Sequence, residues 1–167
     1  DSVDAARWRI SAQPDAPPVV TLVRPARDLT VVPNAVIPVE ASAGDDFGVT
    51  AMSLSFTVKR HTGTEDGGYI LPLEARSSKN ARSTAKWEIA ALGLSPGDEI
   101  TYCVKAADNL PDGPQVAASQ ARTARVVTAA EKIAELGRLD SRIQAAIAGA
   151  ARSQESAIEA LREDAAA

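Results

Sequence analysis

The segment GDDFGVTAMSLSFTVKR, residues Gly44 to Arg60, decides the fold. Its second half alternates apolar and polar side chains with a period of two, which is the pattern of a β-strand with one buried face. The apolar set is Met52, Leu54, Phe56 and Val58. We therefore predict a strand over about Val49 to Lys59 whose apolar face contributes to a core.

The first half of the segment contains the triplet Asp46-Phe47-Gly48, which in protein kinases holds magnesium. A kinase also needs a catalytic-loop aspartate and a glycine-rich loop over the phosphates. The single histidine, His61, is followed by Thr62 and not by Arg-Asp, and the sequence has no glycine-rich phosphate loop. We therefore interpret the triplet as a turn that leads into the strand.

Six further runs rich in β-branched and aromatic residues surround this strand, and turn residues separate each run from the next. Ile100, Tyr102, Val104 and Ala106 form a second inward set, and Trp87 is expected in the core. The absence of a helical pattern between the runs favours an antiparallel sandwich over a parallel sheet. The predicted strands are about Val19–Val23, Ala35–Ala41, Val49–Lys59, Tyr69–Leu73, Ala85–Ile89, Ile100–Ala106 and Ala121–Val127.

The composition changes near Val127, because all ten prolines precede this residue and alanine and charged residues dominate after it. The expected fold is mainly β. A seven-stranded antiparallel immunoglobulin-like sandwich would span residues 17–127, and a long, coiled-coil-like amphipathic α-helix would follow over residues 128–167. Residues 1–16 would be a linker or the last strand of a preceding repeat, formed by Arg7–Ser11.

The start of the helix has a specific signal. Thr128 and Glu131 match a capping box, which predicts that the helix begins at Ala129 and continues to about Asp164. Apolar residues within it recur at spacings of three and four and form one stripe. The predicted interaction residues are Ile133, Leu136, Leu139, Ile143, Ile147, Ala150, Ile158 and Leu161.

Such a stripe needs a partner surface, since a long isolated helix gains little stability from propensity alone. We expect a second copy of the helix, a downstream helix of the same protein or a helix of another protein; the alternative is that the stripe folds back onto the chain's own sandwich. The charges in the helix exclude a membrane span, so that any membrane anchor would lie elsewhere in the parent protein. A formal net charge of -4 argues against nucleic acid binding.

Acidic and amide side chains gather in two segments that fall at one end of the predicted sandwich, the loop Ser42–Gly48 and the loop Asp108–Ser119. Their oxygens suit calcium, which takes about six to eight oxygen ligands. The alternative is that these side chains cap loop backbone in Asx turns, with Phe47 closing the end of the sandwich. The calcium candidates are Asp45, Asp46, Asp108, Asn109 and Asp112.

No catalytic constellation is evident in the sequence. Cys103 lies in the middle of a predicted strand without a neighbouring base, His61 lies in a polar hairpin tip, and no G-x-S-x-G elbow occurs. The acid pair Asp98-Glu99 follows a turn glycine and is interpreted as a solvated face. We therefore expect a protein that is not an enzyme and needs no cofactor; the alternative function is a ligand-binding module for calcium or glycan at the acidic loops.

The stretch LGLSPGDEITYCVKAADNLPDGPQVAAS, Leu92 to Ser119, resembles fibronectin type III domains, in which a leucine and a proline-bearing turn precede a tyrosine strand. Together with PPVVTLVRP (Pro17–Pro25), IPVEASAGDDFGV (Ile37–Val49) and RVVTAAEKIAEL (Arg125–Leu136), it is similar to the immunoglobulin-like repeats of large, uncharacterised bacterial envelope proteins. The nearest of these is domain-of-unknown-function family 4175. The resemblance implies a non-catalytic structural or protein-interaction module in the periplasm or cell envelope.

Overall fold

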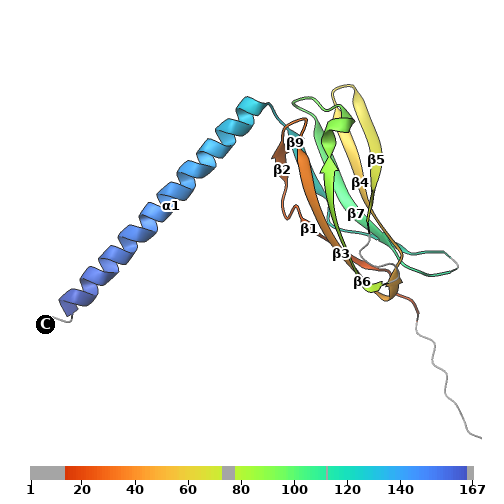
Figure 1. Ribbon diagram of the computed structural model, residues 1–167, viewed down its shortest axis with the longest axis horizontal. Coiled ribbons are helices and arrows are strands. Elements are labelled where there is room, and N and C mark those ends of the chain that lie inside the picture. The colour runs from red at the N-terminus through yellow and green to blue at the C-terminus, as the bar shows by residue number, and fades with distance from the viewer. Residues whose placement is uncertain (1–13, 73–77, 112, 165–167) are drawn as a thin grey trace, which may run out of the picture.

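The computed structural model describes residues 14–72, 78–111 and 113–164, with the side chains of the helix described as far as Ile158. Within these residues the chain forms nine strands in two sheets, followed by one long helix (Figure 1). The prediction of a mainly β protein with a C-terminal helix is confirmed, whereas the predicted count of seven strands is wrong. The strand predicted over Arg7–Ser11 lies outside the described residues.

The first sheet has three antiparallel strands. β1 (Val19–Arg24), β3 (Val36–Val49) and β6 (Ser78–Glu88) follow one another in the order β1-β3-β6. β3 continues through the segment Ser42–Gly48, which was expected to be a loop. It pairs with β6 continuously as far as Gly44 and, after a shift in register, again at Val49. The strand extends this far because the inward positions there are alanines, whose small buried side chains continue the sheet's core face.

The second sheet is mixed. Its order is β2 (Leu29–Val31), β9 (Arg122–Val126), β7 (Glu99–Ala107), β4 (Ala51–Arg60) and β5 (Gly63–Leu71), and β8 (Val116–Ala118) also pairs with β7. β2 and β9 run parallel, which corrects the expectation of a purely antiparallel sandwich. Sequence periodicity misses β2 and β8 because three residues are too few to display an alternation.

The predicted strand over Val49–Lys59 is in fact divided at Thr50, where the chain crosses from the first sheet to the second. The Thr50 amide donates a hydrogen bond to the Ala107 carbonyl at 2.8 Å. Its hydroxyl donates to the Asp108 carbonyl at 2.6 Å. These bonds hold the corner between β3 and β4 against the end of β7, and they thereby bring the two acidic segments to the same end of the sandwich.

Two other strand boundaries differ from prediction. β5 begins at Gly63, because the hairpin turn uses only His61 and Thr62, and the predicted end at Leu73 lies outside the described residues. β6 begins at Ser78, and Ile89 does not close it but opens the short 3-10 helix η1 (Ile89–Leu92). Both extensions are polar stretches on sheet edges, where strands need little apolar alternation.

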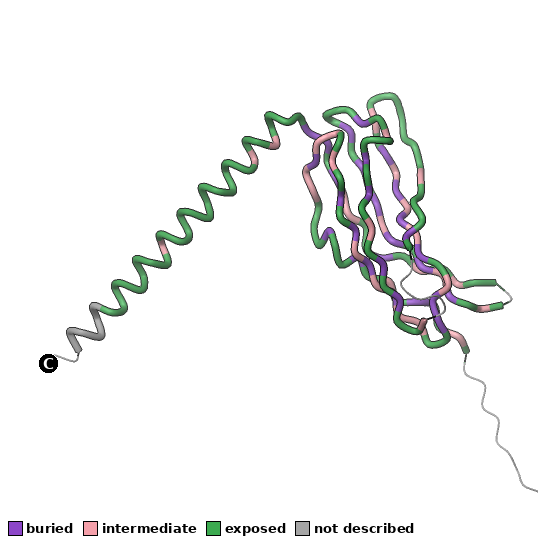
Figure 2. Tube along the Cα trace, viewed as in Figure 1, coloured by how far each residue is buried: buried purple, intermediate pink, exposed green. Residues whose placement is uncertain are grey.

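The core lies between the two sheets and contains both predicted inward sets (Figure 2). Trp87 of β6 is its centre. The Trp87 ring lies 5.1 Å from the Phe56 ring and 5.5 Å from the Tyr102 ring, measured between centroids. Phe56 and Tyr102 are register partners on β4 and β7, so the indole of one sheet contacts a cross-strand aromatic pair of the other.

Gly67 of β5 is the other register partner of Phe56. A Cβ atom at Gly67 would overlap the Phe56 ring, which covers the glycine. The next residue, Gly68, faces the opposite side of the strand, and a Cβ there would meet only the Leu54 carbonyl oxygen, at 3.7 Å. The absence of a side chain at Gly67 is therefore a condition for the position of Phe56 against Trp87.

We predict that Gly67→Ala lowers the free energy of unfolding by about 1–3 kcal/mol, because the added methyl group must displace a ring that is packed on Trp87. Gly68→Ala is the matched control and is expected to change it by less than about 0.5 kcal/mol. Equilibrium denaturation in urea measures both. Equal unfolding midpoints for the two variants would contradict the packing argument.

Candidate functional site

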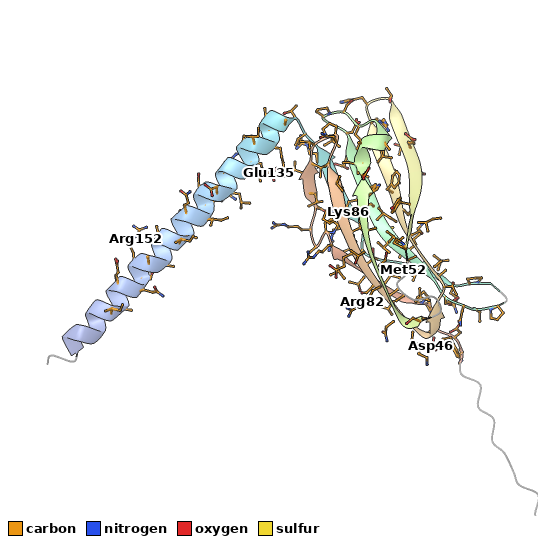
Figure 3. All side chains as sticks on the ribbon, in the orientation of Figure 1. Asp46, Met52, Arg82, Lys86, Glu135 and Arg152 are labelled. Atoms are coloured by element: carbon orange, nitrogen blue, oxygen red, sulfur yellow. The ribbon has the colours of Figure 1, made fainter. Side chains whose placement is uncertain are left out.

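Three carboxylates meet at the end of the sandwich that lies away from the start of the helix, where Figure 3 labels Asp46. Asp15, from the segment before β1, joins Asp45 and Asp46 of β3. Each presents one carboxylate oxygen, and the three oxygens lie within 4.8 Å of one another. The residues that precede β1 thus contribute to a cluster whose other members lie about thirty residues further along the chain.

Asp45 divides its two carboxylate oxygens between different roles. Oδ2 accepts hydrogen bonds from the amides of Phe47 at 3.0 Å and Gly48 at 2.5 Å, which is an Asx-turn arrangement. Gly48 has a φ of 140°, which favours glycine. Oδ1 is shielded from solvent and has no hydrogen-bond partner. The predicted Asx turn is present, but Phe47 is 54% exposed, so the expectation that it closes the end of the sandwich is wrong.

Asp108, which follows β7, has the same division of roles and is fully buried, with 0% exposure. Its Oδ1 accepts from the amides of Leu110 at 3.0 Å and Gln115 at 2.9 Å, which shapes the loop between β7 and β8. Its Oδ2 is buried without a hydrogen-bond partner. A buried carboxylate oxygen of this kind is costly unless some other group neutralises or coordinates it.

The Asp108 loop packs against the other acidic segments. The Gln115 side-chain amide donates to the Asp15 carbonyl at 3.4 Å. The Asn109 side-chain amide donates to the Phe47 carbonyl at 3.4 Å. The loop therefore connects Asp108 to the segment of Asp15 on one side and to the Asp45 turn on the other.

The electrostatics of the cluster are repulsive. Burial of the Asp15 carboxyl raises the pKa of Asp15, and so do its contact with the Asp46 carboxyl and the negative charges of Asp46, Asp108 and Asp45. Both oxygens of Asp15 are shielded and lack hydrogen-bond partners. Within the described ranges, no ion pair links any of these four carboxylates to a basic side chain.

Of the five predicted calcium candidates, Asp45 and Asp46 lie in the three-oxygen cluster, and Asp108 lies at the start of the loop that contacts it. Asn109 instead uses its amide on backbone, and Asp112 lies outside the described residues. Sequence reasoning missed Asp15. An aspartate ahead of a proline pair carries no signal of its own, because its role depends on how the entering segment lies against the two loops.

The second candidate site is α1 (Ala129–Asp164), which begins with the predicted capping box. The Thr128 hydroxyl accepts from the Glu131 amide at 3.1 Å, and the Glu131 carboxylate accepts from the Thr128 amide at 2.8 Å. The Thr128 hydroxyl also donates to the Glu131 carboxylate, at 2.9 Å. The bond from the Thr128 amide lowers the pKa of Glu131 most, and the bond from the Thr128 hydroxyl lowers it further. The first turns also touch the sandwich, where the Thr30 hydroxyl donates to Glu135 at 3.2 Å.

Beyond these turns α1 leaves the sandwich (Figures 1 and 2). The exposed face, here called the apolar stripe, comprises Ile133, Leu136, Leu139, Ile143, Ile147, Ala150 and Ile158. The exposure of its large side chains ranges from 48% at Leu139 to 70% at Ile133. The alternative that the stripe folds back onto its own sandwich is therefore wrong, because no turn reverses the helix. The side chain of Leu161 lies outside the described ones.

The remaining reactive side chains have structural roles or no partner of a catalytic kind. Cys103 is half-buried on β7, and His61 lies in the exposed turn between β4 and β5. The expectation that Asp98 belongs to a solvated face is wrong, because its exposure is only 5%. Its carboxylate accepts from the Ser95 amide at 2.8 Å and lies 3.8 Å from the Arg60 guanidinium, which fixes the turn before β7.

Comparison with known proteins is limited. No family model matches this chain, and no curated protein matches it. Among solved structures, murine CRIg aligns with 68% of this chain and 100% of its own, at 11% sequence identity and a TM-score of 0.39. That likeness is weak, so the immunoglobulin-like topology stays a prediction. In the described part of the chain, no helix combines the length and the hydropathy of a membrane crossing.

We predict that α1 loses helical structure at its first turns as the pH falls below the ordinary value of a glutamate, 4.5. The folded pKa of Glu131 is depressed, so its stabilising contribution is present above that value and is lost as the pH falls through the folded pKa. Far-UV circular dichroism of wild type and Thr128→Ala from about pH 6 to about pH 3 tests this. Thr128→Ala should start with less helix and change less, and identical titration curves would contradict the prediction.

Proposed function

We propose that this chain is a non-catalytic interaction module that pairs with a second copy of itself through the apolar stripe of α1. The observation that supports this proposal is the exposure of large aliphatic side chains along one face of a helix of 36 residues. Burying each such side chain contributes about 1.5–3 kcal/mol. An isolated helix obtains no comparable stabilisation from propensity, so a covering surface is required.

The spacing on the face of the stripe favours another helix as that surface. From Leu136 to Leu161 the positions on this face advance by three, four, four, three, four, four and three residues. This is an eleven-residue repeat of about 3.67 residues per turn, which keeps the face on one side of a nearly straight or slightly right-handed coil. All positions but one are apolar; they are Leu136, Leu139, Ile143, Ile147, Ala150, Gln154, Ile158 and Leu161.

The spacing is also the same in both directions, which supports an antiparallel pair. The spacing is symmetric about the peptide bond that follows Ala148. In an antiparallel pair centred there, each of these positions in one helix would lie opposite another of them in the second helix, and Leu136 would lie opposite Leu161. The polar Gln154 would lie opposite Ile143, where its methylene groups can cover the isoleucine while its amide reaches solvent. Small residues near the centre permit close approach of the two backbones. An antiparallel pair also places the two sandwiches at opposite ends, where they do not collide.

The charge distribution along α1 supports the same arrangement. Residues 131–152 contain four basic and three acidic residues, whereas residues 153–164 contain one basic and four acidic residues. A parallel pair would place the two acidic ends side by side. An antiparallel pair places the acidic end of one copy beside the more basic half of the other, which is the favourable combination.

The setting of this module is part of the proposal. The resemblance of Leu92–Ser119 and its neighbouring segments to immunoglobulin-like bacterial envelope repeats supports an immunoglobulin-like spacer in the periplasm or cell envelope. In that setting the sandwich would separate α1 from whatever precedes residue 14. The resemblance is the sole support for this location.

We predict that the chain self-associates in a concentration-dependent manner and that the double variant Ile143→Asp/Ile147→Asp is monomeric, because two carboxylates would be buried between the paired helices. Ser141→Asp/Ala145→Asp is the matched control: it adds the same charges at the same spacing on the opposite face of α1 and should associate like the wild type. Sedimentation velocity between about 1 and about 200 µM measures all three. A wild type that stays monomeric over this range would refute self-pairing and leave a foreign helix as the occupant.

The orientation is tested by cross-linking in a Cys103→Ser background. Leu136→Cys protein mixed with Leu161→Cys protein should form a disulfide-linked heterodimer on mild oxidation, because antiparallel pairing brings the two positions together. Each variant alone should cross-link poorly. Efficient cross-linking of each variant to itself would show parallel pairing instead.

A further inference from the structure

We propose that Asp15, Asp45, Asp46 and Asp108 form a calcium-binding site at the end of the sandwich remote from α1. The site is independent of the pairing proposed for the helix, since it draws on no residue of α1. It uses four carboxylates from three separate segments, which the sandwich topology brings together at the corner between β3 and β4.

The spacing of the oxygens fits a single ion. Oxygen ligands lie about 2.3–2.6 Å from calcium, so two oxygens bound to the same ion lie up to about 5 Å apart. One oxygen from each of Asp15, Asp45 and Asp46 meets that limit, because the three lie within 4.8 Å of one another. A salt bridge or turn interaction within the protein would not require three carboxylates to approach so closely.

The fully buried Asp108 is the second, independent observation. Its Oδ2 has no hydrogen-bond partner and belongs to a side chain that no solvent reaches. The Gln115 backbone amide donates to Asp108 Oδ1 and the Gln115 side chain donates to the Asp15 carbonyl, so Gln115 links the Asp108 carboxylate to the segment of Asp15. A bound cation supplies the missing partner for this oxygen.

The hydrogen bonds of the two loops position the ligands and do not compete with the ion. Asp45 and Asp108 each use one oxygen to accept two backbone amides and leave the other oxygen buried and free. Fixing one oxygen sets the direction of the other. The Asx-turn and calcium interpretations of these aspartates are thus compatible, because they engage different oxygens of the same carboxylates.

The chemistry of the cluster selects a hard cation. Its members are all carboxylates, and the group contains neither histidine nor cysteine, which zinc and copper sites favour. The exposed Asp46 marks an open side where water can complete the coordination. Calcium accepts this irregular, partly hydrated arrangement, whereas magnesium demands nearly ideal octahedral geometry.

Binding would have a structural consequence for the start of the described chain. Asp15 is in a segment that runs up to β1 and is held to the loop by the Gln115 contact. A cation between Asp15 and the other three carboxylates would fasten residues 14–18 to the end of the sandwich. It would also remove the charge repulsion that the four carboxylates exert on one another.

The test compares thermal unfolding of the full chain in chelator with unfolding in about 5 mM calcium chloride, a concentration that saturates sites with dissociation constants up to about 1 mM. Calcium should raise the melting temperature by about 3 °C or more. Sodium chloride of equal ionic strength and magnesium chloride are the salt controls. Titration calorimetry with calcium should give one site per chain.

Variants separate a calcium site from a cluster that only shapes loops. Asp15→Asn should melt at or above the wild-type temperature in chelator, because it removes repulsion, and should lose the response to calcium. Asp108→Asn should lose the response too. Asp140→Asn on α1 is the control and should respond like the wild type. The proposal is overturned if calcium acts no more strongly than sodium or magnesium chloride, or if Asp15→Asn retains the full calcium response.

Discussion

The contact of Trp87 with Phe56 and Tyr102 is the constraint on which the rest of the sandwich depends. It is the place where one large ring of the three-stranded sheet meets two rings of the six-stranded sheet, so it sets how the sheets lie on one another. Two sheets that meet only through aliphatic side chains can pack in several relative positions. Three rings in contact allow few such positions, because each ring has a fixed shape. The β3–β4 corner at Thr50, and with it the acidic end, is held by hydrogen bonds to the end of β7.

The acidic end and the helix are the two places where this chain leaves strong interactions unsatisfied. At the acidic end, negative charge is brought together and partly buried without a basic neighbour among the described residues. Along α1, whose total length is about 54 Å, the large apolar side chains described from Ile133 to Ile158 are exposed to solvent. The first place has uncompensated negative charge, which a bound cation would neutralise. The second has exposed apolar surface, which an apolar helix would cover.

Two edge strands of the sandwich carry exposed charged side chains. The edge strand β6 carries the exposed Arg82 and Lys86, which Figure 3 labels, and the edge strand β5 carries the exposed Glu65 and Asp66. Charged side chains on edge strands oppose pairing with other sheets. The helix α1 differs from these strands, because six large aliphatic side chains are exposed along one of its faces.

Sequence alone determined the features that depend on local periodicity. The alternation around Phe56 and Tyr102, the capping box at Thr128 and the spacing of the apolar stripe each follow from neighbouring residues, and each is present in the structure. The sequence could not predict the number of strands or the parallel pairing of β2 with β9, because strands of three residues are defined by the strands that they pair with. Only the tertiary structure decided that Asp15 joins Asp45 and Asp46 and that the nearby Asp108 keeps a buried oxygen without a partner. Which carboxylates meet, and which oxygens remain unpartnered, depends on how distant segments pack.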